Sequence, residues 1–190
     1  MSGLILLVLV VIVLLWVVGA YNSLIALKNQ VVNAWKQIDV QLKRRHDLIP
    51  NLVNTVKGAM DFERSTLEAV ISARNKAVSA QGVGATAKAE GELTQALGRL
   101  FALTENYPEL KSSQNVLQLQ EELTSTENKV GFARQLYNDV STQYNTKQAQ
   151  FPTNLVAGLA KASPAELWEI EDAGERAVPT VDLSLNKPTA

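Results

Sequence analysis

Residues 4–20 read LILLVLVVIVLLWVVGA, an unbroken apolar run inside a longer uncharged segment that extends from Met1 to Leu27. A helix over the run rises about 25 Å, and its uncharged flank carries it past the roughly 30 Å hydrocarbon core of a bilayer. We therefore predict a transmembrane anchor over residues 1–27, in contact with the lipid bilayer. The residues assigned to this anchor are Leu4, Ile5, Leu9, Ile12, Leu15, Trp16 and Val18.

The anchor is expected to remain attached to the chain. Only Ser2 and Gly3 follow the initiator, whereas a cleavable signal peptide carries a basic segment at this position. A buried core helix is the other interpretation, and branched apolar residues on every face argue against it. Beyond the anchor, five basic residues stand against one acid as far as residue 45, so we expect that side to be cytoplasmic and the N-terminus outside.

Composition removes several classes of function. Lys plus Arg is 18 and Asp plus Glu is 19, so no charge excess indicates binding to nucleic acid. The chain has no cysteine and one histidine, which argues against thiolate chemistry and multi-histidine metal sites. It also lacks the paired Glu-x-x-His motifs of di-iron bundles and the common phosphate-binding motifs. We therefore expect no enzyme, metal or cofactor, and we interpret Glu121, Glu122 and Glu127 as a solvated face.

The remaining chain shows helical periodicity throughout. Apolar ladders predict a helix from the membrane to about Ser79, continuous with the anchor, and Gly82 and Gly84 predict a break with a reversal of direction. A second helix is expected over residues 86–106, since the residue before Pro108 disfavours helix. A third helix begins at Ser112 or Ser113 and ends before Pro152. A short fourth helix opens at Ser163-Pro164 and runs through Ile170, and residues 174–190 form a flexible tail.

These elements predict an all-α protein: an N-terminal transmembrane helix followed by an antiparallel bundle of three to four long helices. The expected divisions are residues 1–27 for the anchor, 28–158 for the cytoplasmic bundle and 159–190 for the short helix and tail. The first apolar stripe is much longer than the second helix, so part of it stays uncovered. Homo-oligomerisation is the expected consequence, with the number of subunits left open.

The densest polar stretch, residues 37–51, contains the candidate interaction and hinge positions. Asp39, Lys43 and Asp47 are spaced by four and are interpreted as solvated ion pairs. Arg45 takes an apolar place in the ladder, so we expect it at the bundle seam with a carboxylate partner, either Glu122 or Glu127. Pro50 predicts a bend, either fixed or a hinge. The candidate residues are Trp35, Asp39, Arg44, Arg45, Asp47, Pro50 and Asn51.

Two further features of the sequence have simple structural explanations. His46 could titrate near neutral pH, but a single histidine on a charged helix is interpreted as a solvated side chain. The Tyr-Asn pairs at 137 and 144 repeat at seven residues and so share one helix face. Core tyrosines with register-setting asparagines explain this repeat.

Several segments together resemble the LemA family: Tyr21-Asn22, AWKQIDVQLKRRHDLIPNLVNTVKG (34–58), LFALTENYPELK (100–111), LQLQEELTSTENKV (117–130), ARQLYNDVSTQYN (133–145) and FPTNLVAG (151–158). The resemblance implies an anchored, helical cytoplasmic domain, no established catalytic activity and, for some members, a part in forming bacterial membrane compartments. Residues 159–179 depart from the Gly- and Phe-rich stretch of many relatives, which puts partners read through that region in doubt.

The sequence thus predicts a single-span protein of the bacterial inner membrane that acts as a self-associating scaffold and organises or shapes the membrane. An unidentified protein partner is compatible with this hypothesis. The alternative is a membrane-anchored signalling or sensory adaptor that transmits through the bent first helix, with Pro50 and Arg45 as the residues that discriminate between the two.

Overall fold

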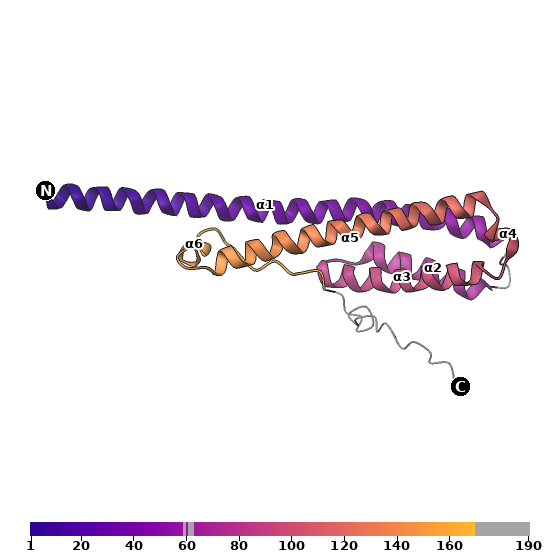
Figure 1. The fold of residues 1–190 in the computed structure, drawn as a ribbon. Helices are drawn as coiled ribbons and strands as arrows, with labels where there is room; N and C mark the ends of the chain where they lie inside the picture. Colours follow the sequence, from indigo (N-terminus) through magenta and orange to yellow (C-terminus); the bar gives the residue numbers. More distant parts are fainter. Residues whose placement is uncertain (59, 61–62, 170–190) are drawn as a thin grey trace, which may run out of the picture.

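The computed structural model describes residues 1–58, 60 and 63–169, and it is all-helical in its regular elements, with no strand in these residues. Four long helices and two short ones follow one another along the chain, as Figure 1 shows. The predicted all-α fold is confirmed. The helices are α1 (Ser2–Lys57), α2 (Arg64–Ser79), α3 (Val83–Thr104), α4 (Pro108–Lys111), α5 (Gln114–Ala149) and α6 (Asn154–Ala157).

Helix α1 joins the apolar N-terminal segment to the bundle without interruption. It has 56 residues and therefore a length of about 84 Å. Its N-terminal part projects alone beyond the other helices (Figure 1), and residues 1–16 are exposed throughout. From Leu24 onward the same helix has buried positions. By length and composition it is the one helix of the described residues that could cross a membrane.

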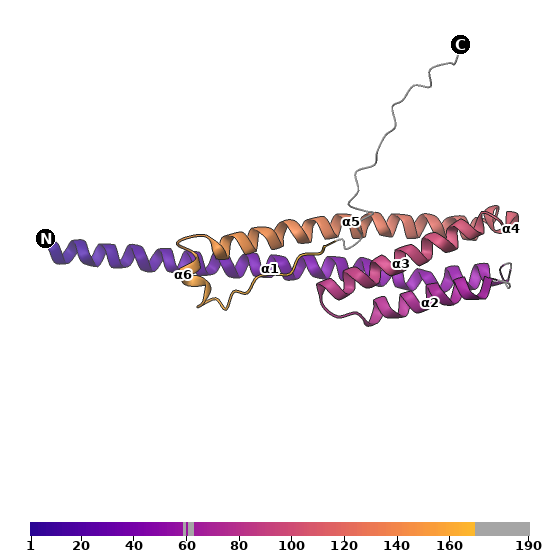
Figure 2. The ribbon, with the colours of Figure 1, turned by 90° about the horizontal axis from the view of Figure 1, so that it is seen from below.

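The expectation that this helix continues to Ser79 is wrong. Helix α1 ends at Lys57, and α2 runs back beside it as a separate helix (Figure 2). The apolar ladder continues through the turn because both helices contribute to one core, which Val56, Met60 and Val70 enter together. Periodicity reports which residues are buried, and it cannot distinguish one long helix from two helices that bury residues in the same core.

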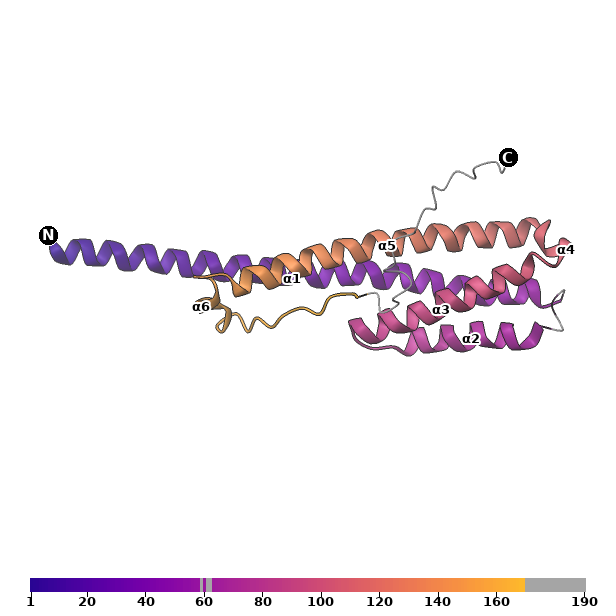
Figure 3. The same cartoon turned by 60° about the horizontal axis from the view of Figure 1, so that its bottom comes forward.

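Helices α2 and α3 form an antiparallel hairpin beside the C-terminal part of α1 (Figure 3). The predicted reversal is confirmed at Gly82, whose φ of 85° is readily adopted by glycine. The second helix ends before Pro108 as expected, and the short α4 follows it. Helix α5 then begins after Ser113, as predicted, and runs back along α1 for almost the whole length of the bundle.

The C-terminal part differs from the expectation. Helix α6 lies before Ser163, and residues 162–169 are neither helix nor strand. They run from α6 along α5 toward the turn between α2 and α3, as Figures 2 and 3 show. The helix predicted from Ser163-Pro164 is therefore wrong for residues 163–169; Ile170 and the expected tail at 174–190 lie outside the described residues. We refer to residues 163–169 as the strap.

Candidate functional site

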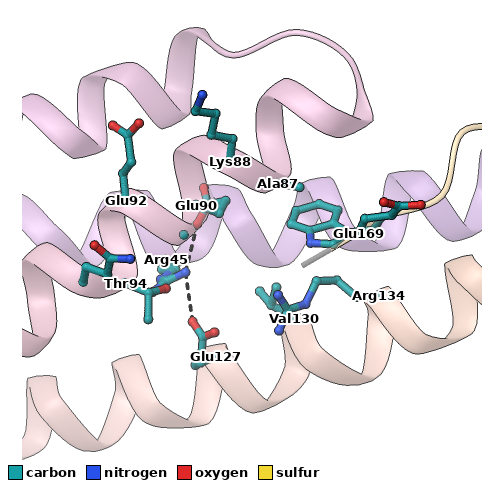
Figure 4. Close-up of a pocket in the computed structure, with 13 residues that line it drawn as sticks. Arg45, Ala87, Lys88, Glu90, Glu92, Thr94, Glu127, Val130, Arg134 and Glu169 are labelled. Atoms are coloured by element: carbon teal, nitrogen blue, oxygen red, sulfur yellow. Dashed lines mark hydrogen bonds and ion pairs between the residues drawn. The ribbon is translucent and has the colours of Figure 1, made fainter. Parts of the chain in front are cut away.

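A charged cluster lies inside the bundle where α1, α3 and α5 meet. Arg45 on α1 is 4% exposed, and its Nη1 lies 2.9 Å from Oε2 of Glu90 on α3, which is 3% exposed. Arg45 Nη2 donates a hydrogen bond of 2.8 Å to Thr94 Oγ1. Glu127 Oε2 on α5 lies 2.9 Å from Arg45 Nη1 as an ion pair outside hydrogen-bond geometry. Arg45 thus connects three helices (Figure 4).

His46 belongs to the same cluster, so its interpretation as a solvated side chain is wrong. It is buried, and its Nε2 lies 2.6 Å from Glu90 Oε1. An ionised carboxylate only accepts hydrogen bonds, so Nε2 is the nitrogen that carries the proton when Glu90 is charged. Glu90 therefore accepts from two consecutive residues of α1, one through each of its oxygens.

The prediction that Arg45 lies at the seam is confirmed, with Glu127 as one of its two carboxylate partners. Glu127 is accordingly paired rather than only solvated. Glu122 is not a partner and instead accepts from Gln118 within α5 at 3.4 Å. The buried partner, Glu90, was missed, although its spacing of three and seven residues from Leu93 and Leu97 places it on the apolar stripe of α3. A charged residue in that stripe was the available signal.

Pro50 lies within α1, which continues through it as helix. Proline has no amide hydrogen, so the carbonyl of His46 loses its helical donor. Arg74 on α2 supplies a replacement, since its Nε donates to His46 O at 3.3 Å. The side chains of Pro50 and Asn51 are exposed. The His46 carbonyl, which Pro50 leaves without a donor in its own helix, thus accepts a hydrogen bond from the neighbouring helix α2.

The other predicted interaction residues separate into one partly buried and several exposed positions. Trp35 packs edge-on against Tyr137 with ring centroids 5.5 Å apart, and lies 6.0 Å from Trp168. Asp39, Arg44 and Asp47 are exposed on α1. The predicted ion pairs of Asp39 and Asp47 with Lys43 are absent from the structure, whose ion pairs among the described residues lie elsewhere.

The strap is held on α5 by two asparagines. Asn138 Nδ2 donates to Trp168 O at 2.9 Å, and Trp168 N donates to Asn138 Oδ1 at 2.8 Å. Asn145 makes the same pair of bonds with Ala165, at 2.8 and 2.7 Å. Each side-chain amide therefore satisfies both the donor and the acceptor of one backbone residue, as a neighbouring strand would in a sheet.

The seven-residue spacing of the asparagines matches the strap. Seven helical residues rise about 10.5 Å, and the three residues from Ala165 to Trp168 span about 10 Å when extended. The Tyr-Asn repeat therefore sets the register of the strap on α5. The asparagines were expected to set register, but the element that they position, the strap, was not foreseen.

Further contacts fix the strap between α3 and α5. Tyr137 Oη donates to Glu166 O at 2.7 Å, and burial raises the pKa of the Tyr137 phenol, which therefore remains a donor at neutral pH. Glu166 Oε1 accepts from the backbone N of Gly84 at 3.2 Å, near the start of α3. The Trp168 ring is buried, and the Arg134 guanidinium carbon lies 5.6 Å from its centroid.

The charged cluster and the end of the strap border one open pocket of about 280 Å³, shown in Figure 4. Its wall carries both charge signs, from Lys88 and Glu92 on α3 to Glu169 on the strap. No group of three potential metal ligands occurs in the described part of the chain. The arrangement fixes the relative positions of three helices and one extended segment.

Comparison with known proteins identifies the family of this chain. A family model described as the LemA family matches residues 34–183, which include the charged cluster and the strap. The chain belongs to the LemA family. This LemA family protein is 31% identical to Protein LemA of Metamycoplasma hominis over 142 residues, which are 74% of the chain and 64% of that relative. The chain thus spans less than two thirds of that relative's length, and the resemblance predicted from sequence is confirmed.

Other relatives of this LemA family protein carry a different name. It is 24% identical over 189 residues to Magnetosome protein MamQ 2 of Paramagnetospirillum magneticum, covering 86% of the chain and 70% of the relative. It is 22% identical to Magnetosome protein MamQ of Magnetospirillum gryphiswaldense with the same coverage. Together with the apolar helix, these comparisons support a membrane-associated helical protein.

Proposed function

We propose that this LemA family protein is a single-span scaffold that associates with copies of itself and organises the bacterial inner membrane. The observation that supports this proposal most directly is that α1 passes without interruption from an exposed apolar segment into a packed bundle. An apolar helix of this length that no protein surface covers is stabilised in hydrocarbon. The bundle is then attached to the membrane through a continuous helix rather than a flexible linker.

The direction of insertion follows from charge. Lys28 and Lys36 are exposed on α1 directly beyond the uncharged segment, on the bundle side. The positive-inside rule then places the bundle in the cytoplasm and the N-terminus outside. Protease treatment of intact cells and of inverted vesicles tests this arrangement, and cleavage of the bundle in intact cells would contradict it.

Self-association is supported by an apolar surface across α1 and α5, formed by Val40, Phe132 and Leu136. Phe132 is 74% exposed, and all three residues line one shallow groove edged by Lys36 and Lys129. Large exposed apolar side chains grouped in this way are typical of interaction sites. The magnetosome proteins among the relatives support the membrane-organising part of the proposal, in line with the compartment role that the family resemblance implies.

Reconstitution of the full chain in liposomes tests the scaffold. We expect crosslinked oligomers and a change in vesicle shape under electron microscopy. Phe132→Glu should remove the oligomers, whereas Val78→Glu, which changes an exposed apolar residue on α2, should retain them. Unassembled protein that neither deforms vesicles nor recruits a partner would contradict the proposal.

A signalling adaptor is the second candidate, and the bond between Arg74 and the His46 carbonyl opposite Pro50 is the feature that favours it. Loss of this bond would change the position of His46 and of the neighbouring Arg45, and so the contact between Arg45 and Glu90 at the seam. If Pro50→Ala abolishes function in cells while insertion, assembly and stability are retained, the adaptor is supported. If function follows oligomer content in all variants, the scaffold is supported.

A further inference from the structure

We propose that the turn after α5, residues 151–162, is a second membrane-binding element that rests on the surface of the bilayer beside the point where α1 enters it. Phe151, Leu155 and Leu159 are the residues that would contact lipid, and we call them the foot. The inference rests on the proposed function in one respect, because it requires α1 to span the bilayer.

The turn has one apolar face toward the bundle and another toward solvent. Val156 and Ala160 are buried against the bundle. Phe151, Leu155 and Leu159 are 80, 68 and 70% exposed. They are spaced by four residues in a turn whose backbone bonds from Asn154 N to Gln150 O and from Ala160 N to Val156 O also span four. Leu155 and Leu159 therefore share one side of a helical turn, and Phe151 is exposed at the beginning of the same turn.

The position of the turn along α1 identifies lipid as its partner. Ala160 packs in one cluster with Leu24, which lies only four residues beyond the apolar run 4–20. Helix α6 is also the part of the bundle nearest to the N-terminus in all three views of the fold (Figures 1–3). A bilayer that holds residues 4–20 therefore has its boundary at the level of this turn.

Charge at this end of the bundle suits a membrane surface. From Val140 to Ala165 the charged residues are Lys147 and Lys161, with no acidic side chain. The first charge on α1 is Lys28. Basic residues beside exposed apolar side chains are the combination by which interfacial segments bind anionic lipids. The foot would insert its apolar side chains at the boundary of headgroups and acyl chains, with the lysines among the headgroups.

Depth measurements on the full chain test this proposal. Because the chain has no cysteine, Leu155→Cys or Leu159→Cys gives one site for an environment-sensitive NBD label. Both positions are exposed, so labelling does not disturb the core. The labelled protein is reconstituted in phosphatidylcholine–phosphatidylglycerol vesicles that contain lipids with a quencher near the headgroup. Val78→Cys, on α2, is the control for an exposed apolar position outside the proposed contact surfaces, and Leu9→Cys reports insertion of the anchor.

We expect lipid quenching of the label at 155 and 159 to be several-fold greater than at 78. Replacement of Lys147 and Lys161 by Gln should reduce it. If the labels at 155 and 159 are no more quenched than at 78 while the label at Leu9 is quenched by deep lipid quenchers, the foot is wrong and the anchored scaffold stands. A second outcome would also overturn the foot. If the labels at 155 and 159 are protected from an aqueous quencher only at high protein density, and lipid quenchers do not reach them, the surface contacts a second copy of the chain. Absence of quenching at Leu9 would overturn both proposals.

Discussion

Asn138 and Trp168 exchange two hydrogen bonds, so one side-chain amide satisfies both backbone groups of a residue thirty positions away. Removal of the amide leaves the Trp168 backbone without its protein partners. Each net hydrogen bond contributes about 0.5 to 1.5 kcal/mol, so Asn138→Ala should weaken strap docking by about 1 to 3 kcal/mol. Faster hydrogen exchange at the Trp168 amide, together with a change in tryptophan fluorescence, would report the release.

A matched control is available on the same helix. Asn128 is exposed on α5, so Asn128→Ala should leave exchange in the strap unchanged. Equal exchange at Trp168 in wild type and Asn138→Ala would show that the asparagine does not hold the strap.

Arg45 and Glu90 form a buried pair whose members depend on each other. Arg45→Met leaves the Glu90 carboxylate buried with only His46, and loss of one partner of such a pair destabilises a protein by about 3 to 5 kcal/mol. Changing both residues to Met should recover much of this loss, since it removes the unpaired charge. Thermal unfolding of the full chain in detergent, followed by circular dichroism, measures the three variants. A double variant as unstable as the sum of the single variants would contradict the coupling.

Pro50 and Arg74 predict a second coupling. In Pro50→Ala the new amide can donate to the His46 carbonyl, which Arg74 now serves. Arg74→Ala should therefore destabilise the wild-type chain by about 1 kcal/mol, as for an ordinary hydrogen bond, and should have a smaller effect in the Pro50→Ala background. A double-mutant cycle by chemical unfolding gives the difference. Equal effects in the two backgrounds would show that the Arg74 bond is independent of Pro50.

Tyr137 predicts a dependence of strap docking on alkaline pH. Burial raises the pKa of its phenol above the ordinary 10.0, so the folded state holds this proton more tightly than the unfolded state. The resulting stability is fully present below the unfolded pKa and is lost as pH rises through the folded pKa. Tyr137→Phe should dock the strap more weakly at neutral pH and lose less on alkalinisation than wild type does. Tyr107→Phe, at a partly buried tyrosine outside the strap contacts, should retain the wild-type profile.

Local chemistry was sufficient to predict much of the fold. The reversal at Gly82, the beginning of α5 after Ser113 and the continuity of α1 with the anchor all follow from backbone preferences and periodicity. The end of α1 was not predictable in this way, because Val56 and Val70 belong to one core and keep the same ladder across two helices. Burial periodicity continues wherever consecutive helices share a core.

The candidate site was predictable where one helix carried the signal. Arg45 interrupts the apolar ladder of α1 and was predicted at the seam. Glu90 interrupts the ladder of α3 in the same manner, although it was not predicted. The strap was not predictable, because Ser163-Pro164 is also a favourable helix start. Tertiary hydrogen bonds override this preference, because Asn138 and Asn145 bind the backbone of Trp168 and Ala165 and hold it extended.

In the proposed anchored arrangement, the uninterrupted course of α1 would also determine how the bundle is oriented on the membrane. Each helical residue turns by 100°, so one Ala inserted between Ser23 and Lys28 would rotate the anchor against the bundle by about that angle, and an insertion of seven would nearly restore the original azimuth. If neighbouring copies meet through Phe132 while their anchors also touch, the two contacts must agree in phase. The continuous helix would then fix the rotation of the bundle relative to the anchor. Insertions would be tolerated or not with the periodicity of the helix, and this pattern would be its signature.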